Sequence, residues 1–369
     1  MSKVIRFVKQ HTVLCIAFVA AAATCFLVPP DAAYAAYFDY KTLACLFMTL
    51  AVVCALRNIR FFTILARRLV RLAGNLRSLA MLLIVITFVG SMLIANDMAL
   101  ITFLPIGYFA LSVTENEQHS AYIFILQNIS ANLGGMVTPF GNPQNLYLYS
   151  FYSIPTGEFM QILFPPFVLA ILLLMACCLP LKRTALTIRD DMNIPLDGKR
   201  TTVYLVLFAL SLLSVFRVLP YWAILIPVTA VLLVMDREAL KCVDYPLLGT
   251  FVLFFIFAGN LSRTPAVREF FSAALQKSTL LMSIASCQCI SNVPSAILLS
   301  PFTANYRELL LGVNIGGTGT LIASLASLIT FSEFRTLYPG QGGRYFRLFT
   351  LLNLLFLGVM TAAAYFFFC

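Results

Sequence analysis

The stretch Thr138-Pro-Phe-Gly-Asn-Pro-Gln-Asn145 is polar and rich in helix-breaking residues, yet it lies inside long apolar sequence. Proline removes a backbone donor and clashes with the preceding helical turn, so two prolines and a glycine interrupt any helix here. At membrane depth, freed backbone groups are tolerated only where they are buried in protein or line a watery cavity. Secondary transporters hold ions and substrate at broken helices of this kind. The stretch therefore predicts a transport site.

The composition of the chain indicates a polytopic membrane protein. Of its 369 residues, 61% are hydrophobic and only 11% are charged, whereas a soluble protein has about a quarter charged residues. Several apolar runs approach the roughly 20 residues that span a bilayer. The formal net charge of +10 comes from basic residues in short loops between these runs, which favours membrane orientation over nucleic-acid binding.

Catalytic and metal-cluster chemistry is not indicated by the sequence. Most of the 10 cysteines lie inside apolar runs, where they behave as small hydrophobic residues, and none has the spacing of a zinc site. No nucleophile–base pair occupies one predicted span. We expect no enzymatic activity, no cofactor, and no metal beyond sodium ions.

Two stretches, residues 79–112 and 278–303, are predicted to be re-entrant hairpins. As one straight helix, residues 79–112 would be about 50 Å long, whereas the hydrocarbon core is roughly 30 Å thick. A hairpin that turns near Asp97 also keeps most of the 25 lysines and arginines on the inner side, as the positive-inside rule requires. The sequence thus predicts an all-α protein with about nine full spans and two hairpins, with the N-terminus inside the cytoplasmic membrane and the C-terminus outside.

The first apolar run, residues 12–28, is open to two interpretations. Lys3, Arg6 and Lys9 precede it and Ala33-Tyr-Ala35 follows it, a pattern that is also typical of a cleaved signal peptide. The internal repeat described next favours a retained first span.

Two motifs occur twice in the chain. Asn96 precedes Pro105 by the same separation as Asn292 precedes Pro301. A second set of residues recurs at one constant offset: Asn132, Gly134, Gly135, Thr138 and Leu146 match Asn314, Gly316, Gly317, Thr320 and Leu328. Polar and glycine matches in register are rare between unrelated apolar stretches. The sequence therefore predicts two inverted repeats.

The predicted domain boundaries follow from this repeat. The first repeat, residues 1–181, holds the hairpin at 79–112 and a broken helix at 121–150. Residues 182–200 form a cytoplasmic linker. The second repeat, residues 201–369, holds the hairpin at 278–303 and a broken helix at 309–330.

Inverted repeats place a binding site at their interface near the middle of the membrane. The hairpin tips and helix breaks supply hydroxyl and amide oxygens that suit a hard cation such as sodium, while the N-termini of the half-helices favour an anion. The candidate substrate-binding residues are Asn96, Asn142, Asn145, Ser291, Asn292, Thr318, Ser324 and Ser327. The candidates for cation binding or proton coupling are Asp97, Asn96, Thr138, Gly141, Asn292, Asn314 and Thr320.

Asp97 is the only acidic residue deep within either predicted hairpin. A membrane-embedded carboxylate is costly unless it is paired, protonated or metal-bound, so it marks a functional site by default. Asp97 is a candidate cation ligand or proton carrier. The structural alternative is that it caps the half-helix that follows.

With Asn96-Asp-Met-Ala-Leu100, the stretch at 138–145 and Ser291-Asn-Val-Pro-Ser295 in place, the chain resembles the ion transporter superfamily. It is similar to the branch of arsenite permeases, citrate transporters and divalent-anion:sodium symporters, and within it to YbiR-like inner-membrane permeases. The resemblance implies a homodimer in which a mobile transport domain moves like an elevator against a scaffold, coupled to sodium or protons.

The two tips depart from the dicarboxylate symporters, in which both read Ser-Asn-Thr. Here they read Ala95-Asn96-Asp97 and Ser291-Asn292-Val293. Asn96, Ser291 and Asn292 carry over from the family pattern, whereas the threonine is missing from both halves. The aspartate looks more like the arsenite permease pattern.

The leading hypothesis is a secondary active transporter that moves a small anion across the cytoplasmic membrane, coupled to sodium or protons. The alternative is a sodium/proton antiporter or arsenite exporter that uses Asp97. The expected partners are the anionic substrate, the lipid bilayer and a second copy of the chain, but not nucleic acid.

Overall fold

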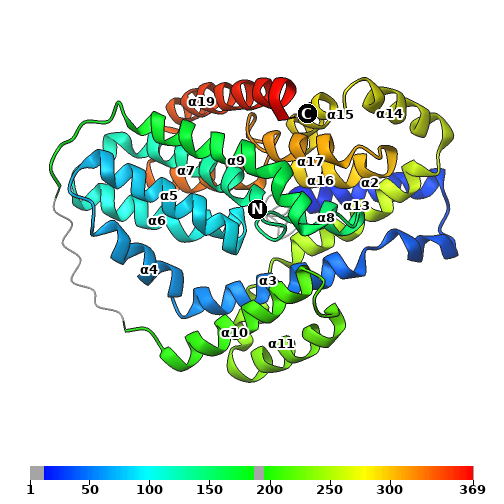
Figure 1. Cartoon of the computed structure of the whole chain (residues 1–369), viewed down its shortest axis with the longest axis horizontal. Helices are drawn as coiled ribbons and strands as arrows, with labels where there is room; N and C mark the ends of the chain where they lie inside the picture. The colour runs from blue at the N-terminus through cyan, green and yellow to red at the C-terminus, as the bar shows by residue number, and fades with distance from the viewer. Residues whose placement is uncertain (1–11, 187–194, 369) are drawn as a thin grey trace.

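The computed structural model of the chain describes residues 12–186 and 195–368, and these residues are helical with one isolated β-bridge, between Asn75 and Ala185 (Figure 1). Lys3, Arg6 and Lys9, and the middle of the predicted linker, lie outside the described residues. The predicted all-α fold is confirmed for the part that is described.

The helices alternate between long apolar segments and short, interrupted ones. The first half contains α2 (Thr12–Leu27), η1 (Ala32–Tyr37), α3 (Tyr40–Asn58), α4 (Phe61–Val70), α5 (Leu76–Ile94), α6 (Asn96–Val113), η2 (Glu117–His119), α7 (Ser120–Gly134), η3 (Gly135–Val137), α8 (Pro143–Phe151) and α9 (Thr156–Cys178). The second half contains α10 (Gly198–Val215), α11 (Tyr221–Met235), α12 (Arg237–Lys241), α13 (Tyr245–Ser262), α14 (Pro265–Lys277), α15 (Thr279–Ile290), α16 (Asn292–Leu299), η4 (Ser300–Phe302), α17 (Tyr306–Ile315), α18 (Leu325–Leu337), α19 (Gly342–Ala363) and η5 (Ala364–Phe368).

Seven helices in the described ranges are long and apolar enough to cross a membrane, so the chain is a multi-pass membrane protein. They are α3, α5, α6, α9, α10, α13 and α19, the last counted with its continuation η5. The predicted number of about nine full spans counts a different set of helices. It included the shorter α2 and α11 and the two interrupted helices, and it counted α5 and α6 as the arms of one hairpin.

Helices α5 and α6 are joined at Ala95 and pack antiparallel to each other. Gly90 of α5 lies against the Phe103 ring of α6, and Gly107 of α6 lies near Leu83 of α5, so the contacts extend away from the joint on both arms. Ala95 has a φ of 66°, a left-handed conformation that reverses the chain within one residue. The turn therefore lies at the position that the sequence predicts.

Helices α15 and α16 form a second pair of the same design. They are joined at Ser291, whose φ is 75°, and the hydroxyl oxygens of Ser286 and Ser295 lie 2.8 Å apart across the pair. The second arm is short because α16 ends at Leu299 and a 3₁₀ turn containing Pro301 follows.

Each helix pair packs beside a helix that is interrupted. Helix α7 stops at Gly134, and α8 starts with Pro143 in its first turn, where a missing N–H group costs nothing. The chain between them folds so tightly that a Cβ atom on Gly141 would lie 2.3 Å from the Gly135 carbonyl oxygen. Helix α17 likewise stops at Ile315, and α18 begins after Ser324, whose hydroxyl accepts a hydrogen bond from the Ser327 N–H group.

Equivalent hydrogen bonds tie each break to its neighbouring helix pair. Thr138 Oγ1 donates to the Met92 carbonyl oxygen over 2.8 Å, and Thr320 Oγ1 donates to the Gln288 carbonyl oxygen over 3.2 Å. The two threonines are partners in the sequence repeat, and both acceptors lie in the last turn before a tip. The repeated sequence thus makes repeated contacts.

The two halves are also joined to each other. Tyr147 of α8 shares a hydrogen bond with Ser300 of η4, with 2.7 Å between their hydroxyl oxygens, and α8 packs against α16. Figure 1 shows α10 and α11 at one edge of the molecule and α19 at the opposite edge, with the interrupted helices between them.

Candidate functional site

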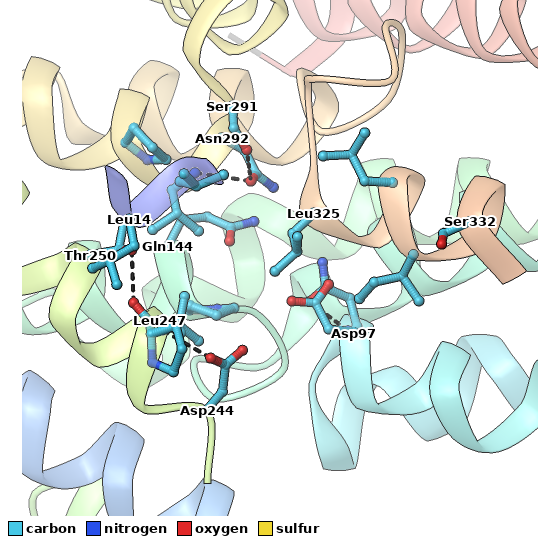
Figure 2. Close-up of a pocket in the computed structure, with 18 residues that line it drawn as sticks. Leu14, Asp97, Gln144, Asp244, Leu247, Thr250, Ser291, Asn292, Leu325 and Ser332 are labelled. Atoms are coloured by element: carbon cyan, nitrogen blue, oxygen red, sulfur yellow. Dashed lines mark hydrogen bonds between the residues drawn. The ribbon is translucent and has the colours of Figure 1, made fainter. Parts of the chain in front are cut away.

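Both tips and the starts of α8 and α18 meet at a cavity of about 530 Å³ (Figure 2). Residues from six regions of the chain line it. They are Val13, Leu14, Asn96, Asp97, Pro143, Gln144, Asp244, Pro246, Leu247, Thr250, Ser291, Asn292, Val293, Pro294, Leu325, Leu328, Ile329 and Ser332. Four predicted site residues are among them: Asn96, Asp97, Ser291 and Asn292.

Helix N-termini converge on this cavity. Helices α6, α8, α16 and α18 each begin with a residue that lines it, and α13 begins one residue after Asp244, which lines it too. The N-terminal turn of a helix carries unsatisfied N–H groups and the positive end of the helix dipole. The cavity is therefore surrounded by positive ends of helices although none of its described lining residues is basic.

Asp97 lies in the first turn of α6 with its carboxylate in the cavity (Figure 2). Its Oδ1 atom is buried and has no hydrogen-bond partner. The side chain that bonds the start of α6 is Asn96, whose Oδ1 accepts from the Asp97 N–H group over 2.9 Å. The structural alternative of a helix cap is thus not what Asp97 does.

Asp244 supplies a second carboxylate, from the turn between α12 and α13 (Figure 2). One of its oxygens caps α13 by accepting from the Leu247 N–H group over 2.9 Å. Within residues 12–186 and 195–368, neither Asp97 nor Asp244 forms a salt bridge. Two acidic side chains therefore share the cavity without a basic partner.

Gln144 lines the cavity from the start of α8 and is only 1% exposed. Its Oε1 atom is buried without a hydrogen-bond partner, and Figure 2 shows its amide turned into the cavity. A buried amide oxygen normally has a partner because leaving it unpaired costs roughly 1–3 kcal/mol. Gln144 is therefore an acceptor available to a ligand.

The second tip is held by its own backbone and by the second break. The Asn292 N–H group donates to the Ala323 carbonyl oxygen over 2.9 Å. Asn292 Oδ1 accepts from the Val293 N–H group over 2.9 Å, the same arrangement that Asn96 makes in the first tip. Ser291 Oγ donates to the Ala323 carbonyl oxygen over 3.3 Å.

Behind the cavity, buried asparagines connect the two halves. Asn96 Nδ2 donates to Asn132 Oδ1 over 3.3 Å, and Asn142 Nδ2 donates to Asn314 Oδ1 over 3.4 Å. Asn314 Nδ2 donates to Asn145 Oδ1 over 2.7 Å. Asn142, Asn145 and Asn314, which we expected to bind ligand, thus bond to each other and do not line this cavity.

The remaining predicted site residues also lie outside the cavity lining. Ser327 accepts a hydrogen bond from Asn128, and Ser324 caps α18. Thr318 bonds to the backbone of α17. Thr138, Gly141 and Thr320 lie in the breaks, where the two threonines bond to the adjacent helix pair.

Three residues of the site were missed in the sequence. Gln144 is part of the motif that opened the analysis, and Asn132 is part of the repeat, so both carried a signal. Asp244 carried none, because it lies in a short loop and belongs to neither repeated motif.

The side chains that line the cavity offer oxygen atoms as ligands for a metal ion. Among the described residues, no group of three or more histidine, cysteine, aspartate or glutamate side chains is placed to hold a metal. Carboxylate and amide oxygens suit hard cations, which bind through oxygen ligands.

Comparisons with known proteins place the chain in a family. The family model described as citrate transporter matches residues 4–310. The chain is 32% identical over 293 residues to the uncharacterized transporter MJ0456 of Methanocaldococcus jannaschii, covering 79% of this chain and 80% of that protein. It is 30% identical over 277 residues to the inner membrane protein YbiR of Escherichia coli, covering 73% of each. The chain therefore belongs to the citrate transporter family of membrane transporters.

Proposed function

We propose that this transporter moves a small carboxylate-bearing anion such as citrate across the cytoplasmic membrane, coupled to sodium or protons. The observation that carries the proposal is the convergence of the N-termini of α6, α8, α16 and α18 on one cavity. Helix N-termini favour bound anions through their N–H groups and dipoles. The matched family is described as citrate transporters, and YbiR is an inner membrane protein.

The proposed membrane arrangement has α5–α6 and α15–α16 as re-entrant hairpins with opposite orientations. The equivalent backbone at Ala95 and Ser291, and the equivalent bonds of Thr138 and Thr320, support two copies of one unit. With the N-terminus inside and the C-terminus outside, the copies are inverted, and the tips meet near the middle of the bilayer.

Within the cavity, Asn96, Ser291 and Asn292 are the proposed contacts of the substrate carboxylates. The amide groups of the two asparagines can donate to carboxylate oxygens, and the Ser291 hydroxyl can do so by exchanging its bond to the Ala323 carbonyl oxygen. The residues that bond to one another or to backbone hold the breaks in position and set where the helices begin. This second group comprises Asn142, Asn145, Asn314, Thr138, Gly141, Thr318, Thr320, Ser324 and Ser327.

An elevator movement in a homodimer is part of the proposal. The two helix pairs and the two breaks form the proposed mobile part, because they share the cavity and bond to each other. Helices α3, α10 and α11 pack on one another and form the proposed stationary part.

A second candidate function is sodium/proton antiport or arsenite export through Asp97. It is favoured by one observation: no lysine, arginine or histidine is among the described residues that line the cavity. A multivalent anion therefore has helix ends and polar side chains, but no basic side chain, to balance its charge.

Uptake into proteoliposomes decides between these candidates. Purified protein would be reconstituted, and uptake of labelled citrate, succinate, sulfate, phosphate and arsenite would be followed under imposed sodium or proton gradients. We expect saturable uptake of citrate that one of the two gradients stimulates, and loss of uptake in Asn292→Ala. The matched control is Asn353→Ala, which changes a buried asparagine on α19 that bonds to Phe349 outside the cavity. Sodium/proton exchange without uptake of any anion would favour the antiporter.

A further inference from the structure

Two of the polar side chains that line the cavity, outside the repeated motifs, bring a carboxylate and an amide to it. Asp244 comes from the start of α13, and Gln144 comes from the first turn of α8. Both lie in the same cavity as Asp97 (Figure 2). Their combination of two carboxylates and an unpaired amide oxygen has a specific chemical use.

We propose that Asp97, Asp244 and the Gln144 carbonyl form a binding site for one hard metal cation, of which sodium is the probe. The inference deepens the proposed function, on which it rests, because it assigns the coupling ion to named ligands. Asp244 is the ligand that the sequence analysis did not propose. With it, the cation site is formed by the tip of the first helix pair and by the start of α13.

Unsatisfied oxygens are the first argument for this site. Asp97 Oδ1 and Gln144 Oε1 are buried and have no partner, and Asp244 uses one oxygen to cap α13, which leaves the other for a ligand. Acceptor oxygens attract a positive charge, and no lysine or arginine is among the described residues that line the cavity. All three residues line the same cavity, and the proposed cation would take its oxygen ligands from them.

Charge is the second argument. Neither carboxylate has a salt-bridge partner in the part of the chain that the structure describes. The ends of α6 and α13 offset part of the negative charge, yet two like charges in one cavity still repel each other. A bound cation removes this repulsion and prepares the cavity for an anion.

The placement of the ligands gives the site a role in coupling. Asp97 belongs to the α5–α6 pair, whereas Asp244 belongs to α13, which packs against α2, α3 and α16. If α13 moves away from the α5–α6 pair, Asp244 is separated from Asp97 and the cation is released. Binding of the cation therefore favours the conformation in which this cavity is assembled.

The test measures cation binding through its effect on thermal stability, without a substrate. Full-length protein in phosphatidylcholine nanodiscs would be unfolded thermally in a sodium titration, with choline keeping the ionic strength constant. We expect sodium to raise the melting temperature of the wild type in a saturable way. Asp244→Asn should weaken the apparent sodium affinity by about tenfold or more. Its melting temperature in choline should not fall, because asparagine still caps the helix and the repulsion is gone.

Two further variants separate a binding role from a structural one. Asp39→Asn is the matched control, since Asp39 also caps a long helix, by accepting from the Thr42 N–H group over 2.9 Å, and does not line the cavity; its sodium affinity should be unchanged. Adding Gln144→Glu to Asp244→Asn restores a second carboxylate and should recover sodium binding.

Either of two results would overturn the inference: a wild type that no sodium concentration stabilises, or an Asp244→Asn variant with wild-type sodium affinity. Failure of the proposed function has a different signature. If citrate uptake is absent while sodium still stabilises the wild type through Asp244, the substrate proposal is wrong and the cation site stands.

Discussion

Ala95 and Ser291 adopt nearly the same left-handed backbone conformation, with φ and ψ of 66° and 152° for Ala95 and of 75° and 159° for Ser291. Each residue directly precedes an asparagine that lines the cavity. This region of φ and ψ is essentially restricted to glycine, and other residues held there store about 1–3 kcal/mol of strain. Both turns therefore hold the same strained backbone directly beside an asparagine that lines the cavity.

Ala95→Gly should stabilise the protein by about 1 kcal/mol, because glycine adopts the observed conformation without a steric penalty. The measurement is the thermal unfolding midpoint in nanodiscs. Ala99→Gly is the control: Ala99 is buried within α6, where glycine costs about 1 kcal/mol. A lower midpoint for Ala95→Gly than for wild type would mean that the turn is not strained.

The bond between Asn145 and Asn314 should be a strong link between the halves. Replacing either residue by alanine removes this bond and leaves one buried N–H or C=O group of the partner unpaired, at a cost of roughly 1–3 kcal/mol. The double variant should therefore lose less stability than the sum of the single variants, with a coupling energy of about 1 kcal/mol. Thermal or denaturant unfolding of the four proteins measures it. Pairing Asn145→Ala with Asn353→Ala provides the control, for which additive losses are expected; additivity for Asn145 and Asn314 would contradict the prediction.

Asp97→Asn should abolish the cation dependence of transport while the protein remains folded. Asparagine is nearly isosteric with aspartate, but its amide group carries no negative charge and does not accept a proton near neutral pH. The measurement is uptake of citrate into proteoliposomes with and without an imposed sodium or proton gradient. Uptake that is still stimulated by the gradient to the wild-type extent would remove Asp97 from the coupling mechanism.

Acid should weaken the link between Asp31 and Arg263, which joins the loop after α2 to the end of α13. Arg263 donates hydrogen bonds of 3.0 and 2.6 Å to the two Asp31 oxygens. This guanidinium holds the pKa of Asp31 below its ordinary value of 3.8. A lowered pKa means that the stabilisation is complete above the ordinary value and is lost as the pH falls through the lower folded value.

Melting temperatures measured from about pH 7 down to pH 3 test this dependence. Arg263→Gln should flatten the acid limb of the curve relative to wild type. Arg200→Gln is the comparison, because the Arg200–Asp197 pair is longer, at 3.7 Å, and exposed. If the melting temperatures of wild type and Arg263→Gln fall equally at low pH, another carboxylate controls the loss of stability.

The helix breaks and the turns could be located from the sequence because their causes are local. Two prolines and Gly141 prevent a regular helix around residues 138–145 whatever surrounds them. The excessive length of the apolar run at 79–112 requires a turn, and Asn96 marks where it lies. In the second half Asn292 recurs at the turn, and Gly316, Gly317 and Gly319 lie in the break, which contains no proline.

The composition of the cavity could not be read in the same way. Gln144 and Asn145 are adjacent polar residues at the start of α8, yet Gln144 lines the cavity and Asn145 bonds to Asn314. Successive residues point about 100° apart around a helix, so the rotation of α8 about its axis decides which of them meets the ligand. That rotation is set by packing against α16 and α17.

The sequence by itself determined that this is a multi-pass helical protein with a repeated helix–break motif and a buried aspartate at one turn, because hydrophobicity, proline geometry and spacing act over a few residues. Only the tertiary structure decided that Asp244 joins Asp97 in one cavity and that most of the expected ligands lie outside its lining, bonded to one another or to backbone. The physical reason is that a side chain's neighbours across the fold depend on how distant helices pack, and this packing leaves no mark at the position of Asp244 in the chain.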